Sequence, residues 1–299
     1  LNEWESDKLF KNEGNGKFVN VSKEMGIENR AWGLSATVSD FNDDGYPDIY
    51  IGNDYIEPDI LHINQKGKGF KDEIWRYFRH TGNHTMGVDI ADVNNDGLVD
   101  LAALDMYAES NQRQKELMTT MVQDRYQSLV KYGYGHQQMR NMLQLNTGAA
   151  PGVGTTFSEV GQLAGIWATD WSWSPLLADF DNDGLKDLYI TNGYRRDVTN
   201  LDYLMYTVDS VMRIGGLSPA NFKTIDEYLN KIPSKPLSNY MYKNKDGIQF
   251  QNVGYDWGLD QPSFSNGSAY ADFDKDGDLD LMVNQFLMGK DNGKHFLHI

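Results

Sequence analysis

The chain has 299 residues, of which 40% are hydrophobic and 23% are charged, which is ordinary for a globular protein. The 43 acidic residues outnumber the 27 Lys and Arg residues, and the resulting formal charge of -16 argues against binding to nucleic acid or anionic lipid. Cysteine is absent, so disulfides and thiolate metal sites are excluded, and no run approaches the ~20 apolar residues that span a membrane.

The content of turn and aromatic residues favours short strands and tight turns. With 29 Gly, 17 Tyr and 13 Phe but only 8 Pro, the sequence predicts a mostly β protein. It begins at Leu1 without Met or a signal-like segment, which suggests a processed or excised chain. All-β chains of this length can form a single domain, so residues 1–299 are expected to form one repeat region.

An internal repeat organises the sequence, and its first copy covers residues 8–54. Leu9–Phe18 has the pattern of a strand, a Gly-rich hairpin and a second strand. A linker with Gly26 leads to a further strand, an Asp-rich loop at Asp40–Asp48 and the hydrophobic strand Ile49–Ile51. Each copy thus predicts four short strands, the content of one β-propeller blade. Related copies follow at residues 59–105, 138–194 and 238–286.

Two helical insertions are predicted between the repeats, at residues 109–140 and 196–236. Each follows the strand after an Asp-rich loop, so both should emerge on one rim. In the second insertion a shorter helix is expected over Thr224–Lys231. Residues 293–299 look like the first strand of a following domain. The apolar residues at helical spacing are Leu117, Met118, Met121, Val122, Leu129 and Val130, then Leu201, Leu204, Met205, Val208, Val211 and Met212.

Four loops share the pattern D-x-[DN]-x-D-G-x-x-D. Positions 1, 3, 5 and 9 offer side-chain oxygens, position 7 offers a carbonyl oxygen, and Gly at position 6 permits a sharp turn. Calcium, a hard cation with six to eight oxygen ligands, suits this arrangement, with up to one Ca2+ in each repeat. The predicted ligands are Asp40, Asn42, Asp44, Tyr46 and Asp48; Asp92, Asn94, Asp96, Leu98 and Asp100; Asp179, Asp181, Asp183, Leu185 and Asp187; and Asp272, Asp274, Asp276, Asp278 and Asp280.

Other interpretations of the loops are weaker. An EF-hand needs Glu at position 12, where this sequence has Ile51, Ala103, Ile190 and Val283. Magnesium keeps several waters, so five protein ligands favour calcium. Asp/Gly turns capped by their own side chains are the structural alternative, but they do not explain so many like charges close together. Since free calcium is scarce in the cytosol, the loops also predict an exported protein.

On these residues the repeat resembles the FG-GAP/VCBS family, whose blades also form the integrin α-subunit propeller. It resembles more closely the bacterial proteins in which such repeats precede an ASPIC/UnbV domain. Besides the loops, the resemblance rests on Lys11–Phe18, Trp171–Pro175 leading to Asp179, and Thr191–Asp197. It implies a seven-bladed β-propeller, of which four repeats are visible here, with calcium in individual blades. It also implies adhesion or ligand recognition outside the cell.

The sequence therefore favours a noncatalytic calcium-binding module at the cell surface or on the periplasmic side, with an unidentified glycan or protein ligand. The alternative is a calcium-dependent enzyme of the polysaccharide lyase kind that works on the propeller rim. No zinc spacing, nucleophile elbow or P-loop is present. Arg195 and Arg196 could hold an acidic ligand. Four tryptophans fit either blade packing or sugar stacking: Trp167, Trp171, Trp173 and Trp257.

Overall fold

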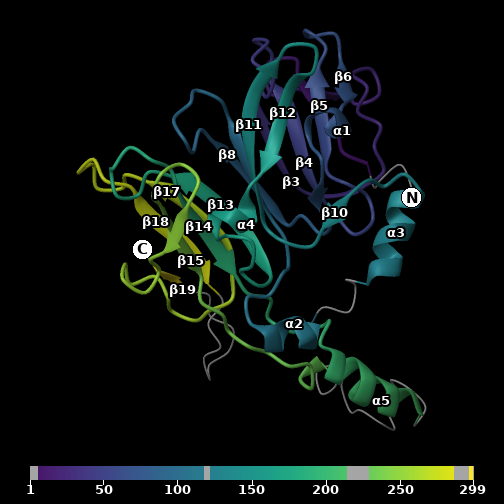
Figure 1. The fold of residues 1–299 in the computed structure, drawn as a ribbon, viewed down its shortest axis with the longest axis vertical. Coiled ribbons are helices and arrows are strands. Elements are labelled where there is room, and N and C mark those ends of the chain that lie inside the picture. Colours follow the sequence, from purple (N-terminus) through teal and green to yellow (C-terminus); the bar gives the residue numbers. More distant parts are fainter. Residues whose placement is uncertain (1–5, 118–121, 214–228, 286–295, 299) are drawn as a thin grey trace.

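The structure is a computed structural model that describes residues 6–117, 122–213, 229–285 and 296–298. Strands dominate it, which confirms the prediction of a mostly β protein (Figure 1). Met118 and Met121 lie outside the described residues, as does most of the helix predicted over Thr224–Lys231.

Three antiparallel sheets contain four strands each, neighbouring one another in chain order. The first consists of β3 (Trp32–Ser39), β4 (Asp48–Asp54), β5 (Ile60–Asn64) and β6 (Phe70–Asp72). The second consists of β8 (Gly87–Ala91), β9 (Asp100–Leu104), β11 (Met142–Ala150) and β12 (Gly154–Glu159). The third consists of β13 (Ser172–Ala178), β14 (Asp187–Asn192), β15 (Tyr240–Asn244) and β16 (Phe250–Asn252).

Smaller groups of strands accompany these sheets. A fourth sheet contains β17 (Ser265–Ala271), β18 (Asp280–Gln285) and β19 (Phe296–His298). The segment at 293–299, predicted to begin a following domain, thus includes a strand that pairs with β18. Near the N-terminus β1 (Phe10–Asn12) and β2 (Phe18–Asn20) form a hairpin, and β7 (Thr81–Gly82) pairs in parallel with β10 (Gln137–Gln138).

Sheets and sequence repeats are offset by two strands. The repeat at residues 8–54 begins with the hairpin β1–β2 and ends with β3–β4, whereas the sheet joins β3–β4 to β5–β6 of the next repeat. In the β4–β5 pair Ile49 lies opposite His62 and Ile51 lies opposite Ile60. The prediction that one repeat forms one blade-like sheet is therefore wrong in its phase. A tandem repeat has the same pattern whichever strand is counted first, so the sequence does not fix this phase.

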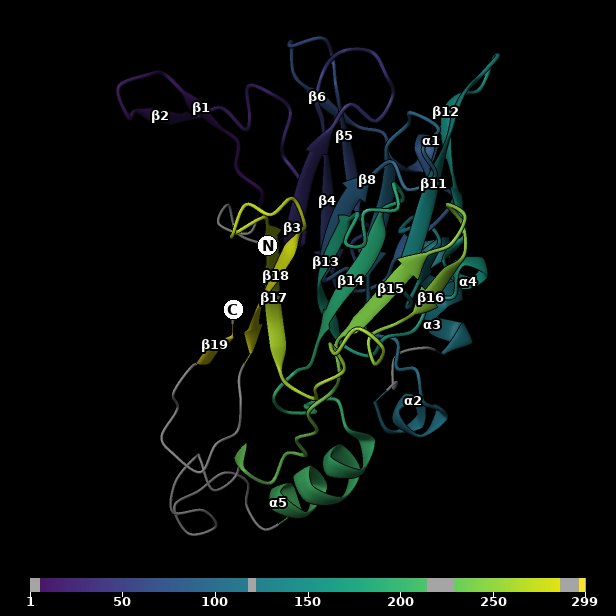
Figure 2. The same cartoon turned by 90° about the vertical axis from the view of Figure 1, so that its left-hand side faces the viewer.

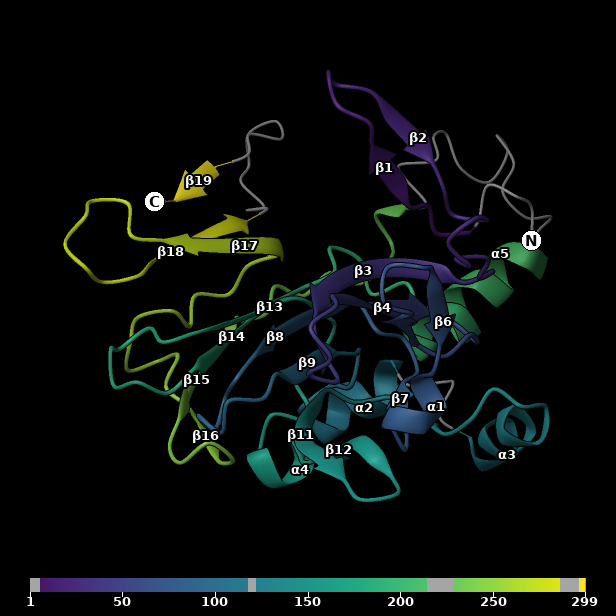
Figure 3. The ribbon, with the colours of Figure 1, turned by 90° about the horizontal axis from the view of Figure 1, so that it is seen from above.

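The four sheets follow one another through contacts between their first strands: β3 contacts β8, β8 contacts β13, and β13 contacts β17. Figure 3 shows β3, β8 and β13 across the middle of the view, with β12 and β16 below them. The approach of β8 to β13 requires glycine at Gly87, where a Cβ atom would lie 1.9 Å from the carbonyl oxygen of Trp173. Among the described residues no sheet closes on itself.

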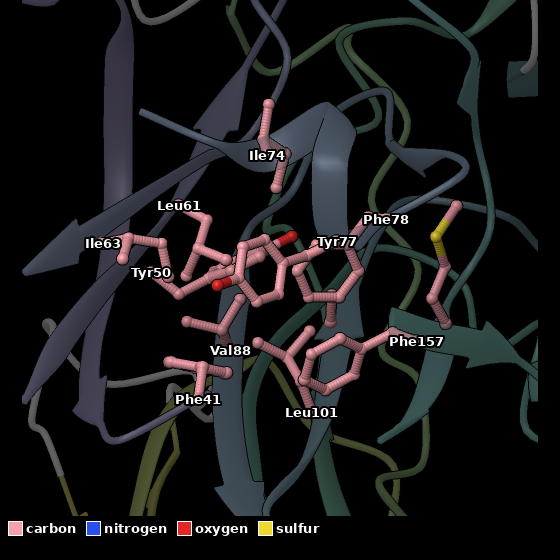
Figure 4. Close-up of a cluster of buried hydrophobic side chains, with 12 residues drawn as sticks. Phe41, Tyr50, Leu61, Ile63, Ile74, Tyr77, Phe78, Val88, Leu101 and Phe157 are labelled. Carbon is pink, nitrogen blue, oxygen red and sulfur yellow. The ribbon is translucent and has the colours of Figure 1, made fainter. Parts of the chain in front are cut away.

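Hydrophobic clusters fill the spaces between successive sheets. Between the first and second sheets Phe41, Tyr50 and Leu61 meet Leu101 and Phe157, all of them buried (Figure 4). Position 2 of the first two Asp loops packs inward, since Phe41 and the corresponding Val93 are both 0% exposed, whereas Phe273 of the fourth loop is 50% exposed. A second cluster joins the second and third sheets, and a third joins the third and fourth. Removing this apolar surface from water holds neighbouring sheets together.

Helices lie at the ends and edges of the sheets. The short helices α1 (Ile74–Tyr77) and α4 (Gly161–Ala164) follow β6 and β12. The first insertion forms α2 (Asn111–Leu117) and α3 (Gln123–Lys131), and the second forms the π-helix η2 (Tyr203–Val208) and α5 (Asp209–Arg213). An Asp loop joins the first two strands of a sheet, and an insertion leaves from the far end of the second strand. The loops and insertions therefore lie at opposite ends, and α2 and α5 share one end (Figure 2).

Candidate metal loops and an aromatic cavity

The four Asp loops have one backbone conformation, which their first residue holds together. In the first loop the Asp40 carboxylate accepts hydrogen bonds from the N–H groups of Asp44 (3.0 Å) and Gly45 (2.6 Å). Asp92, Asp179 and Asp272 accept the same two bonds in their loops. Position 4 has a positive φ in every loop, and so does the Gly at position 6. Only glycine adopts a positive φ without strain, which explains why position 6 is Gly in all four loops.

The Asp at position 9 anchors the first three loops to their sheets. The Asp48 carboxylate is fully buried and accepts the N–H groups of Phe41 (3.0 Å) and Asn64 (2.7 Å). Asp100 and Asp187 are bonded in the same way. Burial raises the pKa of each of these three carboxyls to about 6, although the N–H bonds oppose the shift. A bound cation would stabilise the ionised form of these buried groups.

An Asn at the end of the third strand completes this anchor, and it was not among the residues predicted from the sequence. Asn244 donates from Nδ2 to the carbonyls of Lys186 (3.0 Å) and Val93 (2.8 Å), and accepts the N–H of Gly247 (2.8 Å). Since Val93 belongs to the loop of the preceding sheet, this side chain ties two sheets together. Asn146 reaches Phe41 of the first loop similarly. The available signal was the recurrence of Asn at one repeat position, in Asn12, Asn64, Asn146 and Asn244.

The structure brings predicted ligands together most closely in the last two loops. Oxygens of Asp179, Asp181 and Asp187 lie within 4.8 Å of one another, and so do oxygens of Asp272, Asp274 and Asp276. Three oxygens at this spacing match the chemistry of a hard cation site. In the third loop the ammonium of Lys243 contacts Asp181 and lies 2.9 Å from Asp183, so it already neutralises part of the charge.

The first two loops carry fewer carboxylates because position 3 is Asn. Nδ2 of Asn42 donates to Asp44 (3.4 Å), and Nδ2 of Asn94 donates to Asp96 (3.0 Å). The predicted position 7 ligands Tyr46, Leu98, Leu185 and Asp278 each donate their N–H to the carboxylate of position 5. These internal bonds are also those of self-capped Asp turns, so they fit both interpretations of the loops.

Adjacent loops also contact one another. Nδ2 of Asn95 donates to the carbonyl of Gly184 (3.0 Å), and Nδ2 of Asn182 donates to the carboxylate of Asp278 (2.7 Å). The second, third and fourth loops therefore form one continuous acidic edge at this end of the sheets.

A cavity of about 220 Å³ lies at the opposite end, where the insertions leave the sheets. We call it the aromatic cavity because Tyr55, His84 and Trp171 line it together with apolar residues and two carboxylates. The residues that line the cavity lie at the ends of strands of three sheets and in both insertions, so no single sequence motif marks the cavity. Its lining consists of Asp54, Tyr55, His84, Met106, Leu117, Met139, Asp170, Trp171, Val198 and Thr199.

The four tryptophans singled out in the sequence all pack against other side chains, and one of them also lines this cavity. Trp171 stacks on Tyr194 with ring centres 4.4 Å apart and planes 11° apart, and Trp173 lies parallel to Trp171 at 6.2 Å. Trp257 packs against the cluster between the third and fourth sheets, and Trp167 contacts Tyr107. Of the four, Trp171 lines the aromatic cavity.

A buried Arg joins the two insertions beside this cavity. Nη2 of Arg113 lies 2.9 Å from Asp170, and Nη1 lies 3.2 Å from Asp197. All three side chains are at most 7% exposed, so the ion pairs are shielded from water. A second, more polar cavity of about 440 Å³ shares Asp170 and Arg113 with this cluster and includes Glu109, Tyr240 and Tyr255. Arg196, predicted as a possible ligand-binding residue, donates to Asn230 (2.6 Å) inside the second insertion.

A family model described as an FG-GAP-like repeat matches residues 1–51 and 40–103. The matched residues include the first two Asp loops and the strands on either side of them. The model concerns the repeat alone, so the closer resemblance to ASPIC/UnbV-associated proteins stays a prediction. No curated protein matches the chain. None of the described helices is long and apolar enough to cross a membrane.

Proposed function

We propose that this chain, whose residues 1–103 match the model of an FG-GAP-like repeat, is an exported, calcium-stabilised module that recognises a glycan or protein without catalysing a reaction. The observation that carries the calcium part is the fourth loop, where Asp272, Asp274 and Asp276 place three exposed carboxylate oxygens within 4.8 Å. Like charges this close repel one another unless a cation lies between them.

We propose further that the sheets are blades of a β-propeller. Successive contacts between first strands and apolar packing between neighbouring sheets support this arrangement. The hairpin β1–β2 corresponds to the outer strands of such a blade, because Asn12 occupies the position of Asn64 and Asn244. Calcium in the loops would then stiffen one face of the propeller, and the predicted number of seven blades remains part of this proposal.

We propose that the recognition surface lies at the insertion end, where the cavities of about 220 Å³ and 440 Å³ lie, while the loops lie at the other end. This separation disfavours the alternative of a lyase whose chemistry depends on loop calcium. Such an enzyme needs basic groups and the metal beside the same substrate atoms. Here the length of a strand separates the loops from the cavities.

Thermal unfolding tests the calcium proposal. Saturating calcium should raise Tm above its value in EDTA by roughly 5 °C or more, because a ligand that binds only the folded state stabilises it. Asp276→Ala should reduce the number of bound calcium ions by one, as measured by isothermal titration calorimetry. The matched control is Asp256→Ala, which removes an exposed carboxylate outside the loops. Identical melting curves in calcium and EDTA would argue against structural calcium.

Recognition needs its own experiment. Immobilised glycans and surface proteins should be screened for binding in calcium and in EDTA. Binding that depends on the insertions and not on the loop carboxylates would support recognition at the insertion end. Turnover of a polysaccharide by the folded protein would instead favour the enzyme.

A further inference from the structure

The aromatic cavity lies where the ends of several strands meet. Asp54 ends β4, His84 precedes β8, Met106 follows β9, and Trp171 precedes β13. Leu117 of α2 comes from the first insertion, and Val198 and Thr199 come from the second. Both insertions thus help to enclose one small space at the insertion end.

Two residues with a strained backbone line this cavity. Eight described residues other than Gly have a positive φ. Four of them are position 4 of the Asp loops, and Asn15 and Lys66 lie in Gly-rich hairpin turns. The remaining two are Tyr55 (φ 68°) and Asp170 (φ 70°), and both line the aromatic cavity. A Tyr in this conformation is unfavourable, and such strain is typical of functional sites.

The cavity also contains an unsatisfied polar group. His84 is 6% exposed, and its Nδ1 atom is buried without a hydrogen-bond partner. Burial, and secondarily the charge of Arg125, lowers the pKa of His84 to about 4. The imidazole is therefore neutral at pH 7. It adds an aromatic ring to the lining and no positive charge.

Charge and ring faces in the lining point to one ligand class. Two carboxylates, Asp54 and Asp170, line the cavity, and none of its described lining residues is Lys or Arg. The neighbouring Arg113 is shared by Asp170 and Asp197, so the carboxylates around it exceed its charge. Tyr55 is 53% exposed, and its ring centre lies 6.2 Å from that of His84 and 5.5 Å from that of Trp32. The faces of aromatic rings attract organic cations. The flexible side chains of Met106 and Met139 can make apolar contacts with the methyl groups of such a cation.

We propose that the aromatic cavity binds a small alkylammonium group, such as the trimethylammonium group of choline, held by Tyr55 and Trp171 and by the charge of Asp54. This inference goes beyond the proposed recognition of a glycan or protein, and it rests on the proposal that the recognition surface lies at the insertion end. An anionic ligand would meet the carboxylate of Asp54, and a neutral sugar would leave that charge unbalanced, whereas Asp170 is already paired with Arg113.

The experiment compares choline with its neutral isostere 3,3-dimethyl-1-butanol, using the full chain in calcium and isothermal titration calorimetry. Choline should bind at least about tenfold more tightly, because only the cation interacts with the ring faces and carboxylates. Equal affinity for the two compounds, or no heat of binding with choline, would overturn the proposal. Binding of glucose in place of choline would overturn it as well.

Two substitutions test whether choline binds in this cavity. Asp54→Asn removes the charge at nearly constant shape, and Tyr55→Leu removes a ring that is largely exposed. Each should weaken choline binding about fivefold or more. The control is Tyr132→Leu, which changes a tyrosine that is 75% exposed and does not line the cavity. Equal binding by all three variants would place the cation elsewhere and contradict the proposal.

The source of the ammonium group is settled by a parallel measurement with phosphatidylcholine vesicles. Vesicle binding that Asp54→Asn weakens would assign the cavity to a lipid headgroup, whereas binding of free choline alone would assign it to a soluble compound. If choline fails to bind but calcium still raises Tm, the cavity assignment is wrong and the calcium-stabilised module stands.

Discussion

At the scale of single residues, the anchor between Asp and Asn decides how a loop is attached to its sheet. Asp187 accepts the N–H of Asn244, while the Asn244 side chain reaches the preceding sheet at Val93. The fixed pattern of the loop was enough to predict this Asp from the sequence. It did not show that an Asn about 57 residues later completes the same contact, since the second insertion separates the two.

Replacing this Asn tests the anchor. Asn244→Ala leaves the carbonyls of Val93 and Lys186 and the N–H of Gly247 without this partner, in a position that is 0% exposed. The free energy of unfolding should fall by about 2–4 kcal/mol, because unsatisfied buried polar groups are costly. The measurement is urea unfolding in calcium.

Asn12→Ala is the matched control. This residue has the same repeat position but is exposed, and it accepts only the N–H of Gly14 (2.8 Å). Its replacement should cost less than about 1 kcal/mol. If the two substitutions destabilise the protein equally, the bond to the neighbouring sheet contributes little.

At the scale of elements, the sequence identified the strand pairs and both insertions but not how they combine. The strands followed from hydrophobic runs beside the Asp loops, and the helices from apolar spacing. The sequence did not predict which strand pairs join in one sheet, because β5–β6 follow β3–β4 as regularly as they precede β8–β9. The aromatic cavity was not predictable either, because Tyr55, His84 and Asp170 belong to segments that only the packing of three sheets brings together.

The two insertions are expected to depend on one buried Arg. Arg113→Met leaves the carboxylates of Asp170 and Asp197 without their positive partner, in positions where their side chains are at most 7% exposed. Removing one partner of a buried pair costs about 3–5 kcal/mol. Amide hydrogen exchange should therefore become faster in α2 and in residues 196–213, while the strands of the first sheet keep their protection.

A second substitution separates charge from packing. Adding Asp197→Asn to Arg113→Met removes one of the two stranded charges, so it should restore part of the lost protection. Exchange that rises uniformly over the whole chain in Arg113→Met would mean that the insertions unfold only together with the sheets.

At the scale of the whole molecule, the Tm of this acidic chain in EDTA and the rise in Tm caused by calcium should change in opposite directions with pH. Burial is the largest cause that raises the pKa of Asp59 to about 6 and of Asp105 to about 7, and neither residue belongs to a loop. The folded state therefore binds these protons more tightly than the unfolded chain does. This contribution to stability is complete below pH ~4 and is lost as the pH rises through 6 and 7.

In EDTA, Tm should accordingly fall between pH 5 and pH 7.5, helped by repulsion within a chain of formal charge -16. Asp105→Asn, which cannot titrate, should show a smaller fall. Calcium requires ionised carboxylates, so the rise in Tm that it causes should grow over the same pH range. Calorimetric melts at pH 5 and pH 7.5, each in calcium and in EDTA, give the four Tm values that this comparison needs. A calcium effect that is constant with pH would mean that the ion does not bind the carboxylates of the loops, and the charge of this chain would then need another explanation.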